Sequence, residues 1–318
     1  MNLIDYDFQA GRKICSKEWI KGESLQELCD LIYIQSKGLP DESGDIIIIF
    51  VEMGDIHSFF EKASESKSRF IVISHNGDGR VIDPEKRKID ISPARRVSNV
   101  IAWFSTNLCS PRYALFSIPL GLENSKWFPR EKKIEKIDLF QKRERKSQAL
   151  LYLNFNKYNN LPQREGLYEK YSNASWVTVF DGKNGQDYEN YLDAMISHDF
   201  VLSPEGNGPD THRTWEALYL GTIPILKKHI LHQGWKNELP IVWVNEWSEI
   251  TESFLIEQKN RISSERYRWD ALRVSYWKER IYSIRSFSSV GRVFSFGWKE
   301  SERIIRRHFD KEYFRRRE

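Results

Sequence analysis

Apolar runs of strand length alternate with amphipathic or charged stretches along most of the chain. In the first half, β-branched and aromatic runs predict strands, and Gly, Asn and Asp gather in the turns that follow them. Strands are predicted over 45–51, 69–74, 99–104 and 114–118, with helices over 25–33 and 56–66. Strands that alternate with helices predict an open, doubly wound α/β sheet.

The same alternation returns after a charged stretch at 126–147, which has no clear period and predicts a linker. Strands are predicted over 149–153, 175–180, 200–202, 222–226 and 241–244. Helices are predicted over 187–197, 213–220, 249–258, 265–285 and 300–317. We therefore expect a first Rossmann-like domain over 1–125, a second over 148–262, and C-terminal helices over 263–318, one of which braces the first domain.

Composition agrees with a two-domain globular protein. The 318 residues suit two domains of about 150 residues each. A net charge of +4 does not favour a nucleic-acid partner. Three cysteines without metal-like spacing indicate a reducing compartment. Because no stretch approaches the roughly 20 apolar residues that span a bilayer, we expect no transmembrane segment and a cytoplasmic protein.

The most informative stretch is 200–226, in which a short apolar run leads through a glycine-rich loop into a helix and a returning strand. Gly206 and Gly208 allow a ligand to approach the backbone closely. Asp210 and Thr211 are candidate N-cap residues of the helix. A loop of this kind before a helix N-terminus predicts an anion site.

Arg213 and Glu216 lie about one turn apart on one side of this predicted helix. The guanidinium suits phosphate oxygens, and the carboxylate suits two sugar hydroxyls. Trp215, Leu218 and Tyr219 fall on the opposite side, which would pack under the sheet. The alternative is that Arg213 and Glu216 form a surface ion pair and the glycines a simple turn.

This stretch resembles the nucleotide-sugar motif of exostosin-type glycosyltransferases (glycosyltransferase family 47), and here the motif reads Pro204-x-Gly206-x-Gly208-x-Asp210-x-His212-Arg213-x-Trp215-Glu216-Ala217-Leu218-x-x-Gly221-x-x-Pro224. The resemblance is strong over about 198–247 and weaker over 99–164. It implies the GT-B fold, two Rossmann-like domains facing a cleft, with a nucleotide-sugar donor, usually UDP-linked, and inversion at the anomeric carbon. Many eukaryotic members are anchored by a transmembrane segment. Because we expect no such segment in this sequence, we favour a bacterial or viral protein.

Donor-binding residues follow from the motif and from the loop after the strand predicted over 149–153. The motif contributes Pro204, Gly206, Asn207, Gly208, Asp210, Thr211, His212, Arg213 and Glu216. In related sequences an Arg after such a strand and polar loop approaches the donor phosphates. Asn154 and Arg164 occupy that region here, and the alternative for Arg164 is a surface position at a helix start.

Inverting transfer needs a base that removes a proton from the acceptor hydroxyl. The loop after the strand at 69–74 contains His75 and Asp78, beyond the carboxyl end where ligands of such sheets bind. We favour Asp78, with His75 as the alternative base or as an orienting group. A simple Asn-Gly-Asp turn is the competing interpretation. Further candidates are Glu52, Asp55 and His57, which also suit helix capping.

The sequence thus predicts an inverting glycosyltransferase, xylosyl- or hexosyl-transferring, that uses a glycan or glycoconjugate acceptor and no metal or other cofactor. The only Asp-x-Asp pair of the kind that holds a divalent ion in other transferases is Asp5-Tyr6-Asp7, which is attached to no nucleotide-binding unit. Three alternatives stay open. One is a fucosyltransferase-like GDP-sugar enzyme, although that family has a Glu-Lys pair where this chain has His212-Arg213. The others are a non-catalytic nucleotide-sugar-binding protein and a nucleic-acid-binding protein with basic tails.

Overall fold

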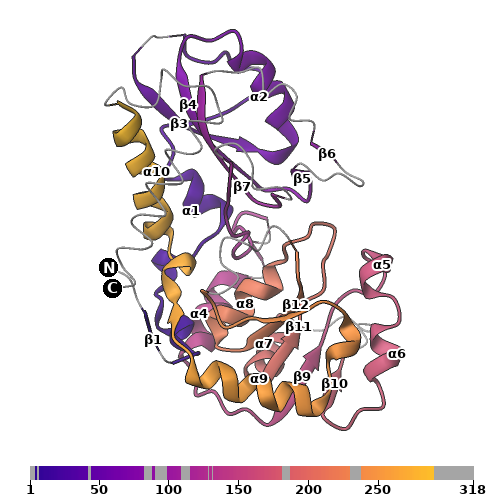
Figure 1. The fold of residues 1–318 in the computed structure, drawn as a ribbon. Coiled ribbons are helices and arrows are strands. Elements are labelled where there is room, and N and C mark those ends of the chain that lie inside the picture. Colours follow the sequence, from indigo (N-terminus) through magenta and orange to yellow (C-terminus); the bar gives the residue numbers. More distant parts are fainter. Residues whose placement is uncertain are drawn as a thin grey trace. The chain divides into compact units, whose positions relative to one another are not determined.

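The computed structural model describes residues 4–5, 7–41, 44–81, 88–89, 99–108, 115–127, 129–130, 132–180, 187–229 and 238–289. The chain divides into two compact units (Figure 1). The donor-side unit, as we call it, comprises Met1–Glu23 and Pro119–Val274, and the second unit comprises Ser24–Ile118 and Ser275–Glu318. Each unit contains one five-stranded parallel sheet, which confirms the predicted α/β class.

The sheet of the donor-side unit has the strand order β10-β9-β11-β12-β13. Its strands are β9 (Ala149–Leu153), β10 (Val177–Val179), β11 (His198–Leu202), β12 (Ile223–Lys227) and β13 (Val242–Val244). All neighbouring strands are parallel. The chain passes from β9 outward to β10 and then returns to β11 on the other side of β9. In open α/β sheets, ligands bind beyond the carboxyl ends of the strands where the order reverses in this way.

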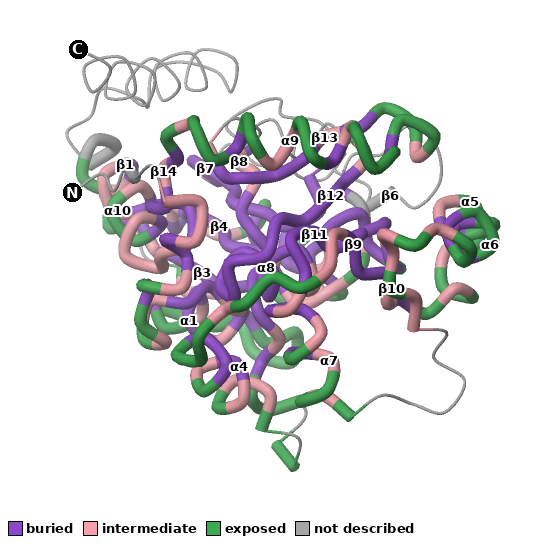
Figure 2. The backbone as a smooth tube through the Cα atoms, turned by 90° about the horizontal axis from the view of Figure 1, so that it is seen from below, coloured by how far each residue is buried: buried purple, intermediate pink, exposed green. Residues whose placement is uncertain are grey.

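Helices cover both faces of this sheet. They are α4 (Lys133–Lys142), α5 (Leu161–Arg164), α6 (Leu167–Tyr171), α7 (Tyr188–Ile196), α8 (His212–Leu220) and α9 (Glu252–Ser264). Helices α4, α7 and α8 pack against one another, and Figure 2 shows α9 on the opposite side of the sheet from α4 and α7. Strand β11 is buried throughout because it is central and covered on both faces.

The start of the chain belongs to the donor-side unit, which differs from the expected boundary at residue 125. The main-chain nitrogen of Ile20 donates to the hydroxyl of Tyr219 on α8 at 3.0 Å. The side chain of Gln141 on α4 donates to the carbonyl oxygens of Gly11 and Ile14, each at 3.1 Å. A short strand β1 (Ile4–Asp5) pairs antiparallel with β14 (Tyr267–Arg268). These long-range contacts leave no local pattern in the sequence.

The segment expected as a linker, 126–147, contains helix α4. Ile137 and Phe140 are buried in the core of the donor-side unit. Their i,i+3 spacing is helical, but the seven charged residues from Glu131 to Lys142 conceal it. Lys136 on α4 lies 3.3 Å from the carboxylate of Glu189 on α7, so these charges connect α4 to a neighbouring helix.

The sheet of the second unit has the order β2-β3-β4-β7-β8, again with parallel neighbours. Its strands are β2 (Leu31–Ile32), β3 (Ile46–Glu52), β4 (Arg69–His75), β7 (Val100–Ser105) and β8 (Leu115–Ser117). Helix α2 (Ile56–Ala63) buries Phe59 and Phe60 against it. Two short strands, β5 (Arg80–Val81) and β6 (Lys88–Ile89), also pair. The described strands follow one another in chain order, so no reversal occurs among them.

The helix predicted over 25–33 is wrong. Helix α1 (Gly22–Gln26) ends early, and β2 then forms at the edge of the sheet. Asp30 causes the change: its main-chain nitrogen donates to the carbonyl oxygen of Ile48, and its carboxylate accepts from the nitrogen of Ile48, both at 2.8 Å. This pair of bonds aligns the segment with β3.

The described C-terminal helix begins nine residues later than predicted, at Val274 instead of residue 265. Helix α10 (Val274–Ser289) replaces the helix predicted over 265–285, and the helix predicted over 300–317 lies outside the described residues. Within the second unit, the guanidinium of Arg285 lies 2.7 Å from the carboxylate of Asp30, and the hydroxyl of Tyr282 donates to the carbonyl oxygen of Leu28 at 3.1 Å. In the part of the chain that the structure describes, no helix has the length and apolar character needed to cross a membrane.

Candidate nucleotide-binding site

The glycine-rich loop lies at the carboxyl end of β11, next to the point where the strand order reverses. Strand β11 ends at Leu202, and the loop runs from Ser203 to Thr211 before α8 begins. The main-chain nitrogen of Gly206 donates to the carbonyl oxygen of Gly208 at 3.0 Å, which closes a tight turn inside the loop. Pro204 and Gly208 are buried, whereas Asn207 at the tip is exposed.

Arg164, at the end of α5, holds this loop in place. Its Nε donates to the carbonyl oxygen of Glu205 at 2.8 Å, and its Nη2 donates to that of Pro204 at 3.3 Å. Its Nη1 donates to the carbonyl oxygen of Asn156 at 2.7 Å, which connects the loop to the segment after β9. The residue is 5% exposed, so it is no surface residue. A guanidinium has five N–H donors, and two of them remain for a ligand.

A side chain at position 206 would disturb this arrangement. A Cβ atom built on Gly206 lies 3.2 Å from Nη2 of Arg164, which is tighter than ordinary van der Waals contact. The lack of a side chain at position 206 therefore leaves room for the guanidinium of Arg164 beside the loop. It would also let a ligand approach the backbone of the loop.

Arg213, in the first turn of α8, has a partly buried side chain without a polar partner. Its Nε is buried and has no hydrogen-bond acceptor, and among the described residues no ion pair involves it. Burial, and then the positive charge of Arg213, lower the pKa of Arg164 to about 10. The charge of Arg213 thus acts on Arg164, and among the described residues neither guanidinium forms an ion pair with a carboxylate. Such a pair favours an anion, and an Arg213–Glu216 surface ion pair is not what the structure contains.

Three hydroxyl groups gather at the start of α8. Oγ of Ser203 lies 2.9 Å from Oγ1 of Thr211 and 2.9 Å from Oγ1 of Thr214. Thr211 is the N-cap residue by its extended backbone, but its side chain makes no capping hydrogen bond. The main-chain nitrogen of Thr214 donates to the carbonyl oxygen of Thr211 at 3.1 Å, so the amides of His212 and Arg213 are the ones that suit an anion at the helix N-terminus.

Asp210 supports the site rather than facing a ligand. It is 4% exposed. Its Oδ2 accepts from the main-chain nitrogen of Leu120 at 2.9 Å. Its Oδ1 accepts from the main-chain nitrogen of Thr211 at 2.8 Å and from the indole of Trp215 at 2.9 Å. The residue is buried and three donors of the protein hold its carboxylate, so its contacts fix the start of α8 in place.

His212 makes a second connection to the same neighbouring segment. Its Nδ1 lies 2.8 Å from the carbonyl oxygen of Gly121. A carbonyl oxygen only accepts, so Nδ1 carries the proton, and Nε2 bears the lone pair of the neutral ring. The imidazole is partly exposed, so Nε2 is the atom of His212 that suits a ligand.

Glu216 is not exposed on the polar face of α8 but is turned toward α7. The residue is 7% exposed. Its Oε1 accepts from the hydroxyl of Tyr188 and its Oε2 from the hydroxyl of Tyr191, each at 2.7 Å. Asn154, after β9, donates from Nδ2 to the hydroxyl of Tyr152 at 2.7 Å. The sequence interpretation missed both tyrosines on α7, although their i,i+3 spacing on a predicted helix was visible.

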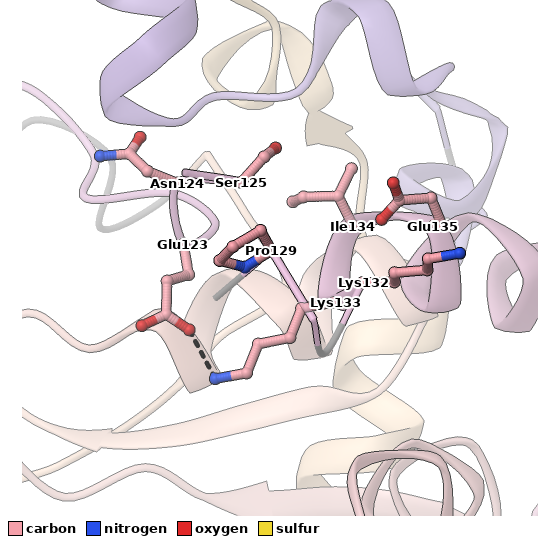
Figure 3. A pocket seen from close by; sticks show the side chains of 8 residues that line it. All are labelled: Glu123, Asn124, Ser125, Pro129, Lys132, Lys133, Ile134 and Glu135. Atoms are coloured by element: carbon pink, nitrogen blue, oxygen red, sulfur yellow. Dashed lines mark hydrogen bonds and ion pairs between the residues drawn. The ribbon is translucent and has the colours of Figure 1, made fainter. Parts of the chain in front are cut away.

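A cavity of about 170 Å³ lies at the N-terminal turn of α4, between that helix and the preceding segment (Figure 3). At its edge the ammonium of Lys133 lies 2.6 Å from the carboxylate of Glu123, both side chains being about one-fifth exposed. The same ammonium lies 5.4 Å from the ring centroid of Tyr188. This ion pair therefore adjoins the Tyr188–Glu216 contact.

The candidate bases belong to the second unit. His75 is the last residue of β4 and is 1% exposed, with its Nδ1 3.0 Å from Oδ1 of Asn76. Asp78 is exposed in the loop that follows. Of the further candidates, Glu52 ends β3, and His57 lies 3.5 Å from the carboxylate of Glu61 on the surface of α2. Asp55 is the N-cap residue of α2 by position.

Within the described residues, no three His, Cys, Asp or Glu side chains are grouped as around a metal ion. Of the Asp-x-Asp pair near the start of the chain, Asp5 lies in β1 and pairs with Tyr267.

Two comparisons with known proteins find similarities to this chain. Residues 163–283 match the family model described as RXYLT1 C-terminal domain. The matched span contains Arg164, the glycine-rich loop, and Arg213 and Glu216 on α8. Among solved structures, the chain is similar to sucrose-phosphate synthase from Thermosynechococcus elongatus, with a TM-score of 0.37 and 12% identity over 84% of this chain and 73% of that one. No curated protein matches the sequence.

The two parallel-sheet units are the kind of α/β unit from which GT-B glycosyltransferases are built. The resemblance to the exostosin-like glycosyltransferases is confirmed over residues 163–283, the span that matches this family model.

Proposed function

We propose that the protein is an inverting, metal-independent glycosyltransferase that moves a xylosyl or hexosyl group from a UDP-linked donor to a hydroxyl of a glycan or glycoconjugate. The observation that carries the proposal is the pair Arg164 and Arg213, beside a glycine-rich loop and a helix start, inside the span that matches an exostosin-like family model.

The donor diphosphate would bind Arg213 and the free amides at the start of α8, with Arg164 holding the loop and adding positive charge. During transfer, the diphosphate leaves with additional negative charge. Fixed cations and amides stabilise such charge without a metal ion. Glu216 would accept the ribose hydroxyls. The nucleotide sugar is a substrate, so no further cofactor is involved.

The acceptor hydroxyl gives its proton to Asp78, and its oxygen attacks the anomeric carbon of the donor sugar. The bond from that carbon to the phosphate oxygen breaks, and UDP leaves with both electrons of the bond. Attack opposite the leaving group inverts the configuration. Asp78 suits the base because its carboxylate is exposed, whereas His75 is buried and is the alternative.

Calorimetric titration with UDP tests the donor site. Replacing Arg213 with Ala should weaken UDP binding by about 10- to 100-fold, since charge-assisted hydrogen bonds contribute roughly 1.5–3 kcal/mol. Arg261→Ala is the matched control, because Arg261 lies on α9 in an ion pair with Glu265 at 2.8 Å. Equal UDP affinity in the two variants, or no UDP binding by the unmodified protein, would contradict the proposal.

The donor, the base and the metal requirement need separate measurements. A thermal-shift panel of UDP-, GDP- and TDP-sugars identifies the donor, because excess ligand raises the melting temperature; a GDP-sugar preference would indicate the fucosyltransferase-like alternative. Asp78→Asn should abolish transfer and leave UDP affinity unchanged. Unchanged turnover would transfer the role to His75. Transfer should continue at the same rate with a chelator present.

A further inference from the structure

The carboxylate of Glu216 is held symmetrically by two phenols from one neighbouring helix. Tyr188 and Tyr191 lie one turn apart on α7, and each hydroxyl donates to a different carboxylate oxygen at 2.7 Å. The rings are themselves stacked, with centroids 5.6 Å apart. Two side chains of α7 therefore fix one carboxylate of α8 in one orientation.

Both phenols stay protonated donors in this setting. Burial, and then the negative charge of Glu216, raise the pKa of Tyr188 and of Tyr191 well above the ordinary value. The positive charge of Arg213 acts on Tyr191 in the opposite direction. Arg213 and Glu216 also lie one turn apart on α8, so the carboxylate and the cation that we assign to the donor phosphates belong to one helix.

The geometry leaves acceptor capacity on both carboxylate oxygens. A carboxylate offers about four lone-pair sites, and the two tyrosines use one on each oxygen. One site per oxygen remains, so the carboxylate can accept one hydrogen bond on each oxygen from two adjacent hydroxyls of a sugar ring.

We propose that Tyr188 and Tyr191 are positioning residues that hold the Glu216 carboxylate so that its remaining lone pairs accept the 2′- and 3′-hydroxyls of a nucleotide ribose, and that they thereby make the site selective for ribonucleotides. The inference rests on the proposed function, because it requires a nucleotide diphosphate to bind near Arg213. It adds the part that the two tyrosines of α7 take in holding the carboxylate for the ribose.

The first measurement compares UDP with 2′-deoxy-UDP by calorimetric titration of the unmodified protein. Loss of one hydroxyl to a charged acceptor should weaken binding by about 10-fold. In Tyr188→Phe and Tyr191→Phe, UDP affinity should fall and 2′-deoxy-UDP affinity should change little. The ratio of the Kd for 2′-deoxy-UDP to the Kd for UDP should therefore decrease toward one.

Tyr171→Phe is the matched control. Its hydroxyl donates to the carbonyl oxygen of Trp247 at 2.6 Å, and it lies in the same unit without contact to Glu216. The control should lose some thermal stability and keep the full preference for UDP. If Tyr188 and Tyr191 had only a structural role, Tyr188→Phe and Tyr191→Phe would also lose thermal stability but would keep the preference for UDP over 2′-deoxy-UDP. That result would overturn the inference.

Two other results would also overturn it. Higher UDP affinity in the tyrosine variants would show that the phenols cover the carboxylate instead of presenting it. Equal affinity of the unmodified protein for UDP and 2′-deoxy-UDP needs no variant and would refute the ribose assignment alone. Binding of neither nucleotide would overturn the proposed function together with this inference, so the two failures are distinguishable.

Discussion

Asp210 and Leu120 are joined by a hydrogen bond from the main-chain nitrogen of Leu120 to Oδ2 of Asp210 at 2.9 Å, across 90 positions of the chain. The bond holds the beginning of α8 against the segment that begins at Pro119, within the same unit. The carboxyl group is buried, and its burial raises its pKa from 3.8 to about 6, although its hydrogen bonds act in the opposite direction. This shift makes the contact testable by pH.

Replacing Asp210 with Asn should lower stability at pH 7 by about 1–3 kcal/mol, because an amide nitrogen cannot accept from Leu120. The pH dependence has a defined sign. A carboxyl group with a raised pKa in the folded state contributes most below about pH 4, and this contribution is lost as the pH rises through 6. The difference in Tm between the unmodified protein and the variant should therefore shrink from pH 4 to pH 6 and stay constant to pH 8. A difference that grows over that range would refute the raised pKa.

Gly206→Ala tests how closely the loop approaches Arg164. The new Cβ would lie 3.2 Å from Nη2 of Arg164, so that the guanidinium must shift by a few tenths of an ångström. We expect a loss of roughly 1 kcal/mol, about fivefold in the Kd for UDP. Gly54→Ala is the control, since no atom lies within 4 Å of its Cβ. Titration showing the same UDP affinity for both variants would mean that the loop tolerates the shift.

Gly221 ends α8 in the left-handed conformation, with φ of 79°. An alanine there should cost about 1–2 kcal/mol from backbone strain, and its Cβ would also lie 2.7 Å from Cδ of Arg12. Gly166→Ala isolates the first effect, because Gly166 has φ of 74° and nothing within 4 Å of its Cβ. Chemical denaturation should show a larger loss for Gly221→Ala. Equal losses would show that Arg12 moves aside freely.

The unit β11–α8–β12 was the part most predictable from sequence. An apolar run, two glycines, a helix-starting Thr211 and a terminal Gly221 are local signals, and the structure puts each element within two residues of its predicted bounds. The long strand β3 was equally clear, because an uninterrupted run such as Ile46–Val51 has few other stable arrangements.

What could not be predicted depends on partners distant in sequence. The edge strand β2 exists because Asp30 bonds to Ile48, and nothing within 25–33 shows this. Glu216 was expected on a polar face, but Tyr188 and Tyr191 draw it between α7 and α8. Helix periodicity assigns a side chain to a face and does not say which neighbour covers that face.

Arg164 and Arg213 offer a last comparison, since the same residue type has two different settings in one site. Arg164 donates to three carbonyl oxygens, whereas Arg213 donates to none in the part of the chain that the structure describes. A lysine has one ammonium and cannot reproduce the planar three-way contact. Arg164→Lys should therefore lower both thermal stability, by about 1–3 kcal/mol, and UDP affinity, by about 10-fold or more. Arg213→Lys should lower UDP affinity alone, because no contact within the protein is lost.

Thermal unfolding without ligand and calorimetric titration with UDP measure the two effects independently. If Arg164→Lys reduced affinity without reducing stability, Arg164 would act as a phosphate ligand and not as the support of the loop.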